Sequence, residues 1–447
     1  MSGGNAIFTN GDGTVHPALI QGKTAAAKGF GFDPTPALAE SCETCWLFTR
    51  INLSGARMQL SHRITNIIGG GSDGWEVFYK ARQMKEAGQD ILELTIGEHD
   101  RKTDAQILRA MYDSASAGNT GYAVVPGTGA LRRAIAERVQ ARTGVPTGPE
   151  NVIVTPGGQA ALFAAHMAVL DPGDTALFLD PYYATYPGTL RSVGAKAAAI
   201  QTQPENAFLP TAADLAHAPK GAKSLLINSP NNPSGVVYNR DTMETICDFS
   251  RKNDLWLISD EVYDTQIWQG EHLTPRAQPG MAERTLVVGT MSKSHAMTGS
   301  RVGWLVAPAE VIPRLIDLST CTTYGVPGFI QDAALFALQQ GADLEEGVAA
   351  TFRQRRLLAQ DVLKGENALR LIPSSGAMYL MLDIRATGLS GQEFARQLLD
   401  QEKIAVMPGE SFGQAAAGHI RVAMTIADDR FTAALQRLAD FAKRMPQ

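Results

Sequence analysis

The chain has 447 residues, enough for two domains, because a single hydrophobic core rarely grows beyond about 250 to 300 residues. Its formal net charge is -5 at pH 7, and 44% of its residues are hydrophobic. This balance favours a soluble enzyme and argues against a nucleic-acid-binding protein, which needs a basic surface. No apolar stretch approaches the roughly 18 residues of a membrane span and no secretory signal is evident, so we expect a cytoplasmic protein that does not enter membranes.

The first part of the chain gives few structural signals. Residues 1–57 show no sustained hydrophobic periodicity, and we expect them to be poorly specified or loosely held. Two of the four cysteines, Cys42 and Cys45, have the spacing of a metal or redox pair, but a zinc site would need a second pair. We therefore expect these two, together with Cys247 and Cys321, to be free thiols, and we expect no metal site.

Regular patterns begin after residue 60. Apolar residues at helical spacing predict a helix over 75–87, and residues 91–96 predict a short strand that leads into a turn at Gly97. A loop containing Tyr122 then precedes a second predicted helix over 129–142.

Six apolar runs follow, and they lack the polar alternation of a strand with one face in water. They are residues 151–155, 175–180, 224–228, 255–260, 285–289 and 303–306. Because both faces of such strands must be covered, we predict an α/β fold whose mostly parallel sheet carries helices on each side. Polar residues or glycines follow the runs, and ligands bind at the carboxyl ends of strands in such sheets.

The remainder of the chain mixes helices and strands. The predicted helices are residues 308–318, 330–340, 351–363 and 392–402. Residues 376–383 predict a strand, and a second strand surrounds Arg421. The planar guanidinium of Arg421 can donate two parallel hydrogen bonds, which suits recognition of a carboxylate.

The longest polar motif follows the fifth apolar run and reads TMSKSHAMTGSR, residues 290–301. Lys293 would lose hydration in a crevice at the strand end, which lowers the pKa of its amine and frees the lone pair to attack a carbonyl. The hydroxyls of Thr290 and Ser292 and the guanidinium of Arg301 suit a phosphate nearby. This combination predicts a nucleophilic lysine beside an anionic ligand.

A second phosphate signal follows the first run. A glycine turn there opens a helix at Gly158, followed by Gln159 and Ala160. Free backbone N–H groups and the helix dipole at such a position bind anions.

Taken together, these motifs resemble those of the class I/II pyridoxal-phosphate-dependent aminotransferases of fold type I, which are aspartate aminotransferase-like. The resemblance rests on Ser-Lys followed by Arg in residues 292–301, on Asn-Pro-Ser-Gly in residues 232–235, and on Asp-Glu-Val-Tyr in residues 260–263. The matches extend from Gly97 to Arg421 in the order that the family shows.

The resemblance implies roles for these residues. Lys293 would bond to pyridoxal 5'-phosphate and act as general base and acid, Asp260 would lie beneath the ring nitrogen, and Tyr263 would bind the phenolic oxygen. The implied cofactor-binding residues are Gly158, Gln159, Ala160, Tyr183, Asn232, Asp260, Tyr263, Thr290, Ser292, Lys293, Arg301 and Tyr122. The implied substrate-binding residues are Gly97, Asn232 and Arg421. The role of Tyr122 would be to reach the phosphate of the neighbouring subunit, which implies a homodimer with a shared active site.

A domain organisation is also implied. The large cofactor-binding domain would span residues 106–308 with a mostly parallel sheet, and residues 58–105 and 309–447 would form a smaller α+β domain. Residues 1–57 would be an extension. Members of the family usually begin near the position of Met58, so one hypothesis places the true start there.

The implied reaction moves an amino group between an L-amino acid and a 2-oxo acid by a ping-pong mechanism. Gln159 stands where members that prefer acidic substrates often have lysine, so the sequence does not favour an aspartate-type specificity and leaves the donor open. A C–S β-lyase on the same scaffold is an alternative, as is a regulator domain that senses the cofactor. The regulator would carry a basic winged-helix module in front, and residues 1–57 show neither its helices nor its charge. A nicotinamide-dependent dehydrogenase is disfavoured, because no Gly-x-Gly-x-x-Gly opens a βαβ unit.

Overall fold

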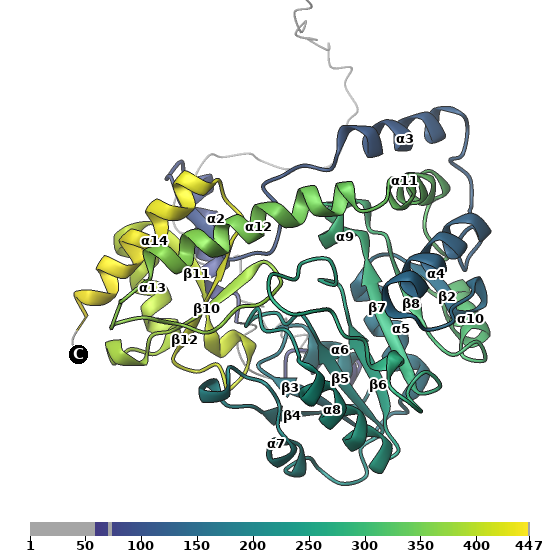
Figure 1. The fold of residues 1–447 in the computed structure, drawn as a ribbon, viewed down its shortest axis with the longest axis horizontal. Coiled ribbons are helices and arrows are strands. Elements are labelled where there is room, and N and C mark those ends of the chain that lie inside the picture. Colours follow the sequence, from purple (N-terminus) through teal and green to yellow (C-terminus); the bar gives the residue numbers. More distant parts are fainter. Residues whose placement is uncertain (1–58, 70–73, 446–447) are drawn as a thin grey trace, which may run out of the picture. The chain divides into compact units, whose positions relative to one another are not determined.

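Two β-sheets organise the chain in the computed structural model, which describes residues 59–69 and 74–445 (Figure 1). The strands are β1 (Leu92–Leu94), β2 (Val152–Thr155), β3 (Thr175–Asp180), β4 (Lys196–Gln201), β5 (Ser224–Asn228), β6 (Trp256–Asp260), β7 (Thr285–Thr290), β8 (Gly303–Val306), β9 (Arg370–Leu371), β10 (Tyr379–Asp383), β11 (Ile404–Pro408) and β12 (His419–Ala423). The helices are α1 (His62–Thr65), α2 (Glu76–Glu86), α3 (Ala105–Ser116), α4 (Gly129–Thr143), α5 (Gly158–Val169), α6 (Tyr186–Ser192), α7 (Ala212–Ala216), α8 (Arg240–Lys252), α9 (Met291–Ser294), α10 (Ile312–Cys321), α11 (Gly328–Gln339), α12 (Asp343–Val362), α13 (Gly391–Glu402) and α14 (Asp428–Lys443).

The larger sheet has seven strands in the order β2-β8-β7-β6-β5-β3-β4. Strand β8 is antiparallel to its neighbours β2 and β7, and the other adjacent pairs are parallel. The mostly parallel sheet predicted from the apolar runs is therefore confirmed. Because the parallel strands end at the same edge, the residues that follow them gather there.

Alternate residues of one strand explain why these runs are apolar throughout. Val152 and Val154 of β2 pack on one face of the sheet with Leu131 of α4, whereas Ile153 packs on the opposite face with Ala161 of α5. Helices cover both faces, so every position along the strand lies in a hydrophobic core.

The smaller sheet has five strands in the order β1-β11-β12-β10-β9. Strands β1 and β11 are parallel, and the other pairs are antiparallel. Helices α2, α12, α13 and α14 contribute to its core. The long helix α12 runs from beside the short helix α9 to helix α14 of this region (Figure 1).

Several elements differ from the sequence-based expectation; helices α3 and α14, for example, were not predicted. Strand β4 was not predicted, because its sequence, KAAAIQ, has little hydrophobic patterning; parallel pairing with β3 at the sheet edge forms it. Strand β11 was not predicted either, and it pairs with both β1 and β12. Helix α12 begins at Asp343 rather than residue 351, and acidic residues in its first turn favour that start through the helix dipole.

Four further expectations concern residues 1–57, the cysteines, membrane spans and the domain boundaries. Those for residues 1–57, including Cys42 and Cys45, lie outside the described residues. Within residues 59–69 and 74–445, Cys247 is a buried free thiol and Cys321 an exposed one, and no helix is both long and apolar enough to span a membrane. The proposed domain boundaries stay a prediction.

Candidate active site

A cavity of about 310 Å³ lies at the carboxyl ends of the parallel strands, between the two sheets. It brings together all but two of the residues selected from the sequence. Those lining it are Gly97, Gly158, Gln159, Tyr183, Asn232, Asp260, Tyr263, Thr290, Ser292, Lys293, Arg301 and Arg421. Ala160 and Tyr122 do not line it, although both were predicted to bind the cofactor.

Lys293 enters this cavity from the short helix α9, which begins directly after β7. The Thr290 hydroxyl caps this helix by accepting a hydrogen bond from the Ser292 N–H at 3.2 Å. The Lys293 Nζ then donates to the carbonyl oxygen of Gly97 at 2.5 Å. The amine therefore points across the cavity to the segment after β1, as a nucleophile in a crevice should.

Asp260 ends β6 and is buried, with 3% of its surface exposed. Its carboxylate accepts a hydrogen bond from the Tyr186 hydroxyl at 2.6 Å. Burial raises the pKa of Asp260 to about 6. A cationic partner would keep this acid ionised, because an opposite charge nearby favours the charged form.

Asn228 connects the segment after β5, which contains Asn232, to the end of β6 at Asp260. Its amide nitrogen donates to the backbone oxygen of Asp260 at 2.9 Å, and its amide oxygen accepts from the Asn232 N–H at 2.8 Å. One buried side chain at the end of β5 thus fixes the positions of both residues.

Arg421 projects from β12 and is 1% exposed. Its guanidinium donates to the Asn232 side-chain oxygen at 2.8 Å and to the backbone oxygen of Thr95. It lies between two aromatic rings, with its central carbon 4.5 Å from the Tyr379 centroid and 4.3 Å from the Phe412 centroid.

The charge of Arg421 lacks a counter-ion among the described residues. No carboxylate in the described part of the chain pairs with it, and its Nε has no hydrogen-bond partner there. Burial lowers the pKa of this guanidinium from its usual value. A buried cation without an acid is costly, so the arrangement fits an anionic ligand.

Tyrosines form one wall of the cavity. The hydroxyls of Tyr263 and Tyr379 are 3.1 Å apart, and Tyr183 meets Tyr186 edge to face with ring centroids 5.8 Å apart. Burial raises the pKa of Tyr183 to about 12, so this ring stays uncharged at neutral pH.

The amino end of α5 has features that suit an anion, and Gly158 and Gln159 of its first turn line the cavity. No side chain among the described residues caps this helix, which leaves its first N–H groups available. Its N-cap, Gly157, has φ 81°, and a Cβ there would lie only 2.4 Å from an Arg301 nitrogen. Glycine is thus what allows the Arg301 guanidinium to rest against the helix end, while Thr290 and Ser292 add hydroxyls.

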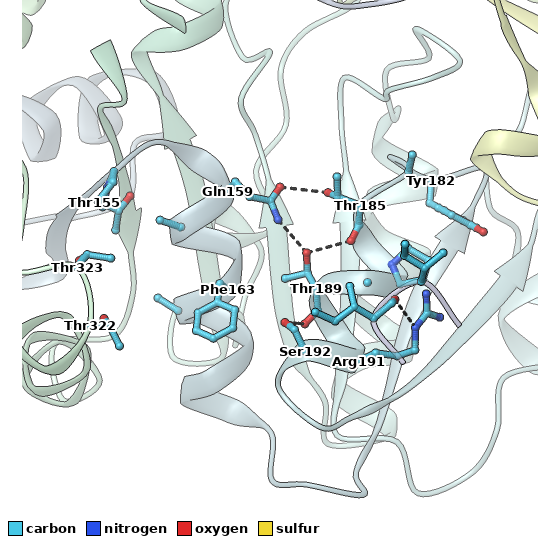
Figure 2. A pocket seen from close by; sticks show the side chains of 18 of the residues that line it. Thr155, Gln159, Phe163, Tyr182, Thr185, Thr189, Arg191, Ser192, Thr322 and Thr323 are labelled. Atoms are coloured by element: carbon cyan, nitrogen blue, oxygen red, sulfur yellow. Dashed lines mark hydrogen bonds between the residues drawn. The ribbon is translucent and has the colours of Figure 1, made fainter. Parts of the chain in front are cut away.

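A second cavity, of about 870 Å³, adjoins the first and shares Trp75, Gln159 and Arg301 with it. Figure 2 shows its wall, where Gln159 is held between two threonines. The Gln159 amide nitrogen donates to the Thr189 hydroxyl at 2.8 Å, and its oxygen accepts from Thr185 at 3.1 Å.

The two selected residues outside the 310 Å³ cavity have different locations. Ala160 lines the second cavity, one residue from Gln159. Tyr122 lies on the surface with 93% of its area exposed, and its ring packs against Tyr324 with centroids 5.1 Å apart. In this single chain Tyr122 takes no part in the cavity.

Sequence reasoning missed three residues that shape the site: Tyr186, Asn228 and Tyr379. Asn228 ends the apolar run 224–228 and Tyr186 lies three residues after Tyr183, yet neither was assigned a role from the sequence. Tyr379 lies on a strand that the sequence predicted, but its type and spacing carried no functional signal. Contacts between distant segments reveal all three.

Comparison with known proteins extends these observations. A model of the family described as aminotransferase class I and II matches residues 89–438. The arginine–pyruvate transaminase of Pseudomonas aeruginosa is 41% identical over 384 residues, which cover 86% of this chain and 98% of that protein. The aspartate/prephenate aminotransferase of Thermus thermophilus is 35% identical over 368 residues, covering 80% and 93%. The solved structure of aspartate aminotransferase from Thermus thermophilus with maleate matches with a TM-score of 0.80 at 34% identity, covering 86% of this chain and 100% of the other.

The chain therefore belongs to the aminotransferase class I and II family. It is a pyridoxal-phosphate-dependent aminotransferase of the aspartate aminotransferase type, acting on amino and oxo acids. The resemblance stated from the motifs and the predicted fold type I are confirmed.

Proposed function

We propose that this chain transfers an amino group between an L-amino acid and a 2-oxo acid in the 310 Å³ cavity, with pyridoxal 5'-phosphate held there by Lys293. The observation that carries the proposal is that one cavity contains both a lysine amine and the buried Arg421, which lacks an acid partner in the described chain. The amine can bond to an aldehyde, and the guanidinium can bind the α-carboxylate that amino and oxo acids share.

The residues present fit the cofactor. The first turn of α5 with Arg301 would hold the phosphate, because Gly157 leaves room for the guanidinium against the helix end. Thr290 and Ser292 would donate hydroxyl hydrogen bonds to the same group. Asp260 would bind the protonated ring nitrogen, which offsets the burial of its carboxylate.

Other side chains would set the cofactor's orientation. Tyr183 would pack against the ring, and Asn232 and Tyr263 would hydrogen-bond its phenolic oxygen. When bound, the cofactor supplies an aldehyde and a cationic ring that accepts electrons released at the substrate's α-carbon. Lys293 would hold the aldehyde through its amine and, once that amine is free again, Nζ would take up the α-proton as general base and donate a proton as general acid.

We further propose that the preferred donor has no second carboxylate. Among the described residues, the cations that line this cavity are Lys293, Arg301 and Arg421, and the proposal already assigns a role to each. Gln159 is neutral and held by two threonines, and the acid Glu98 lines the cavity with its side chain exposed. An acidic lining attracts a cationic side chain, and the relative of 41% identity is named an arginine–pyruvate transaminase.

A donor panel tests this proposal. With pyruvate as acceptor, we expect kcat/KM for L-arginine to exceed that for L-aspartate by at least about tenfold, because aspartate's second carboxylate finds no cation. Glu98→Gln should lower kcat/KM for arginine by about threefold or more and leave alanine unchanged. If aspartate is the better donor in the native protein, the donor assignment is wrong.

The same panel tests the reaction class. We expect no 2-oxo acid product to accumulate beyond one equivalent per site unless an acceptor is added, because the amino group must leave the enzyme on a second substrate. Sustained release of ammonia and pyruvate from a sulfur-containing amino acid, without acceptor, would indicate the C–S β-lyase instead.

We also propose that the protein is a homodimer whose subunits complete each other's sites. Tyr122 and Tyr324 form an exposed aromatic projection, and Thr322 and Thr323 beside it line the 870 Å³ cavity (Figure 2). A projection next to a hollow suits a two-fold interface, in which each copy offers both to the other. Tyr122 would then reach the phosphate next to Arg301 of the partner.

Mixing two inactive variants tests this arrangement. Lys293→Ala and Tyr122→Ala homodimers are dissociated in mild denaturant and reassembled together. If Tyr122 acts across the interface, each heterodimer regains one intact site, so activity should rise toward about a quarter of wild type. No gain on mixing, or a monomer by light scattering, would contradict the shared site.

A further inference from the structure

The backbone of the segment between β1 and α3 accepts hydrogen bonds from both Lys293 and Arg421. We call residues 95–103 the strap. The backbone oxygen of Thr95 accepts a hydrogen bond from Arg421, and that of Gly97, two residues later, accepts one from Lys293 Nζ at 2.5 Å. One short piece of backbone thus holds the group assigned to the substrate carboxylate and the group assigned to proton transfer.

The strap lies very close to the cavity wall. A Cβ on Gly97 would be only 1.8 Å from the Tyr379 hydroxyl oxygen, so glycine is required for this approach. Further along, the Thr103 hydroxyl donates to the backbone oxygen of Ala296 at 2.6 Å, which joins the end of the strap to the segment after Lys293.

His99, in the middle of the strap, forms no ion pair within the described residues. Neither ring nitrogen of His99 makes a close hydrogen bond within the described residues, although the ring faces the backbone of Ser292 and Lys293, and it packs on Phe352 with centroids 5.2 Å apart. Burial and the nearby charge of Lys293 lower the pKa of His99 to about 3, so it stays neutral.

The next residue anchors the strap. Asp100 accepts hydrogen bonds from both terminal nitrogens of Arg355, at 2.9 and 2.7 Å. Arg355 projects from α12 and is 3% exposed, and it also donates to the Met424 backbone oxygen at 2.9 Å and to Asp428 at 2.8 Å. Met424 directly follows β12, the strand that carries Arg421.

We propose that Arg355 is a positioning residue for the reaction. Its two parallel hydrogen bonds to Asp100 connect the strap to the end of β12. The backbone oxygens of Thr95 and Gly97 then hold Arg421 and Lys293 at the separation that a bound amino acid requires. This inference rests on the proposed function of those two residues. The physical basis is that paired parallel hydrogen bonds from a buried guanidinium fix direction as well as distance.

The two acids on Arg355 provide a matched test. Asp100→Asn and Asp428→Asn each remove one negative charge from the same guanidinium, but only Asp100 belongs to the strap. For Asp100→Asn we expect faster amide hydrogen exchange of residues 95–103 in the cofactor-free protein, and kcat/KM lower by about 10- to 100-fold, because a shift of about 1 Å can have that effect. Asp428→Asn should change both by less than about twofold.

A third variant separates position from charge. Asp100→Glu keeps the ion pair but lengthens the side chain, so stability should stay near that of the wild type while kcat/KM falls by about tenfold. The inference is overturned if Asp100→Asn and Asp428→Asn behave alike, or if Asp100→Glu retains full activity. Hydrogen exchange needs neither cofactor nor turnover, so it tests the strap even if the proposed function fails.

Discussion

Lys293→Ala should lower the transamination rate by more than about 10⁴-fold, because it removes both the amine that bonds to the cofactor and the group that moves the α-proton. The wild-type amine reaches across the cavity to Gly97. No second lysine lines the cavity among the described residues, so no neighbouring amine can replace it.

Two measurements check this expectation. The purified variant mixed with pyridoxal phosphate should lack the absorbance band of lysine-bound cofactor. In the wild type, borohydride reduction and mass spectrometry should find the adduct on residue 293. Lys196→Ala is the control, because that side chain is exposed on the edge strand β4. An unchanged spectrum in Lys293→Ala would place the cofactor on another residue.

Arg421→Met should lower kcat/KM for several amino acid donors alike, by about 10²- to 10³-fold, which corresponds to roughly 3 to 4 kcal/mol of lost transition-state binding. Methionine keeps much of the side-chain volume between Tyr379 and Phe412, so the loss reports on charge rather than on a cavity. Arg421→Lys should restore little, because an ammonium cannot form two parallel hydrogen bonds.

The control for Arg421 is a substrate without the carboxylate. A simple primary amine should react with the cofactor at a similar slow rate in the wild type and in Arg421→Met, because the guanidinium has nothing to bind. If Arg421→Met loses no more activity toward amino acids than toward this amine, relative to the wild type, the carboxylate is bound elsewhere. Thermal unfolding of both proteins shows whether the lost bonds to Asn232 and Thr95 have destabilised the fold.

The sequence by itself determined the class of the protein and most of the residues that line the 310 Å³ cavity. Apolar runs of strand length predicted the parallel strands, and the motifs after them predicted most of the cavity lining, from Gly158 through Asp260 to Lys293. This worked because the signals are local: a glycine turn before a helix, or a lysine directly after a buried strand, acts within a few residues. The fold type and the family were predicted correctly on this basis.

Tertiary structure decided what local signals cannot express. Three tyrosines follow β3, and only the folded chain shows that Tyr186 is the one that donates to Asp260, 74 residues away. Tyr379 meets Tyr263 across 116 positions of sequence, and Arg355 reaches Asp100 across 255. Such pairings depend on which strands become neighbours and on where each side chain points after the turn. They arise from the tertiary packing of distant segments, and no short stretch of sequence contains that information.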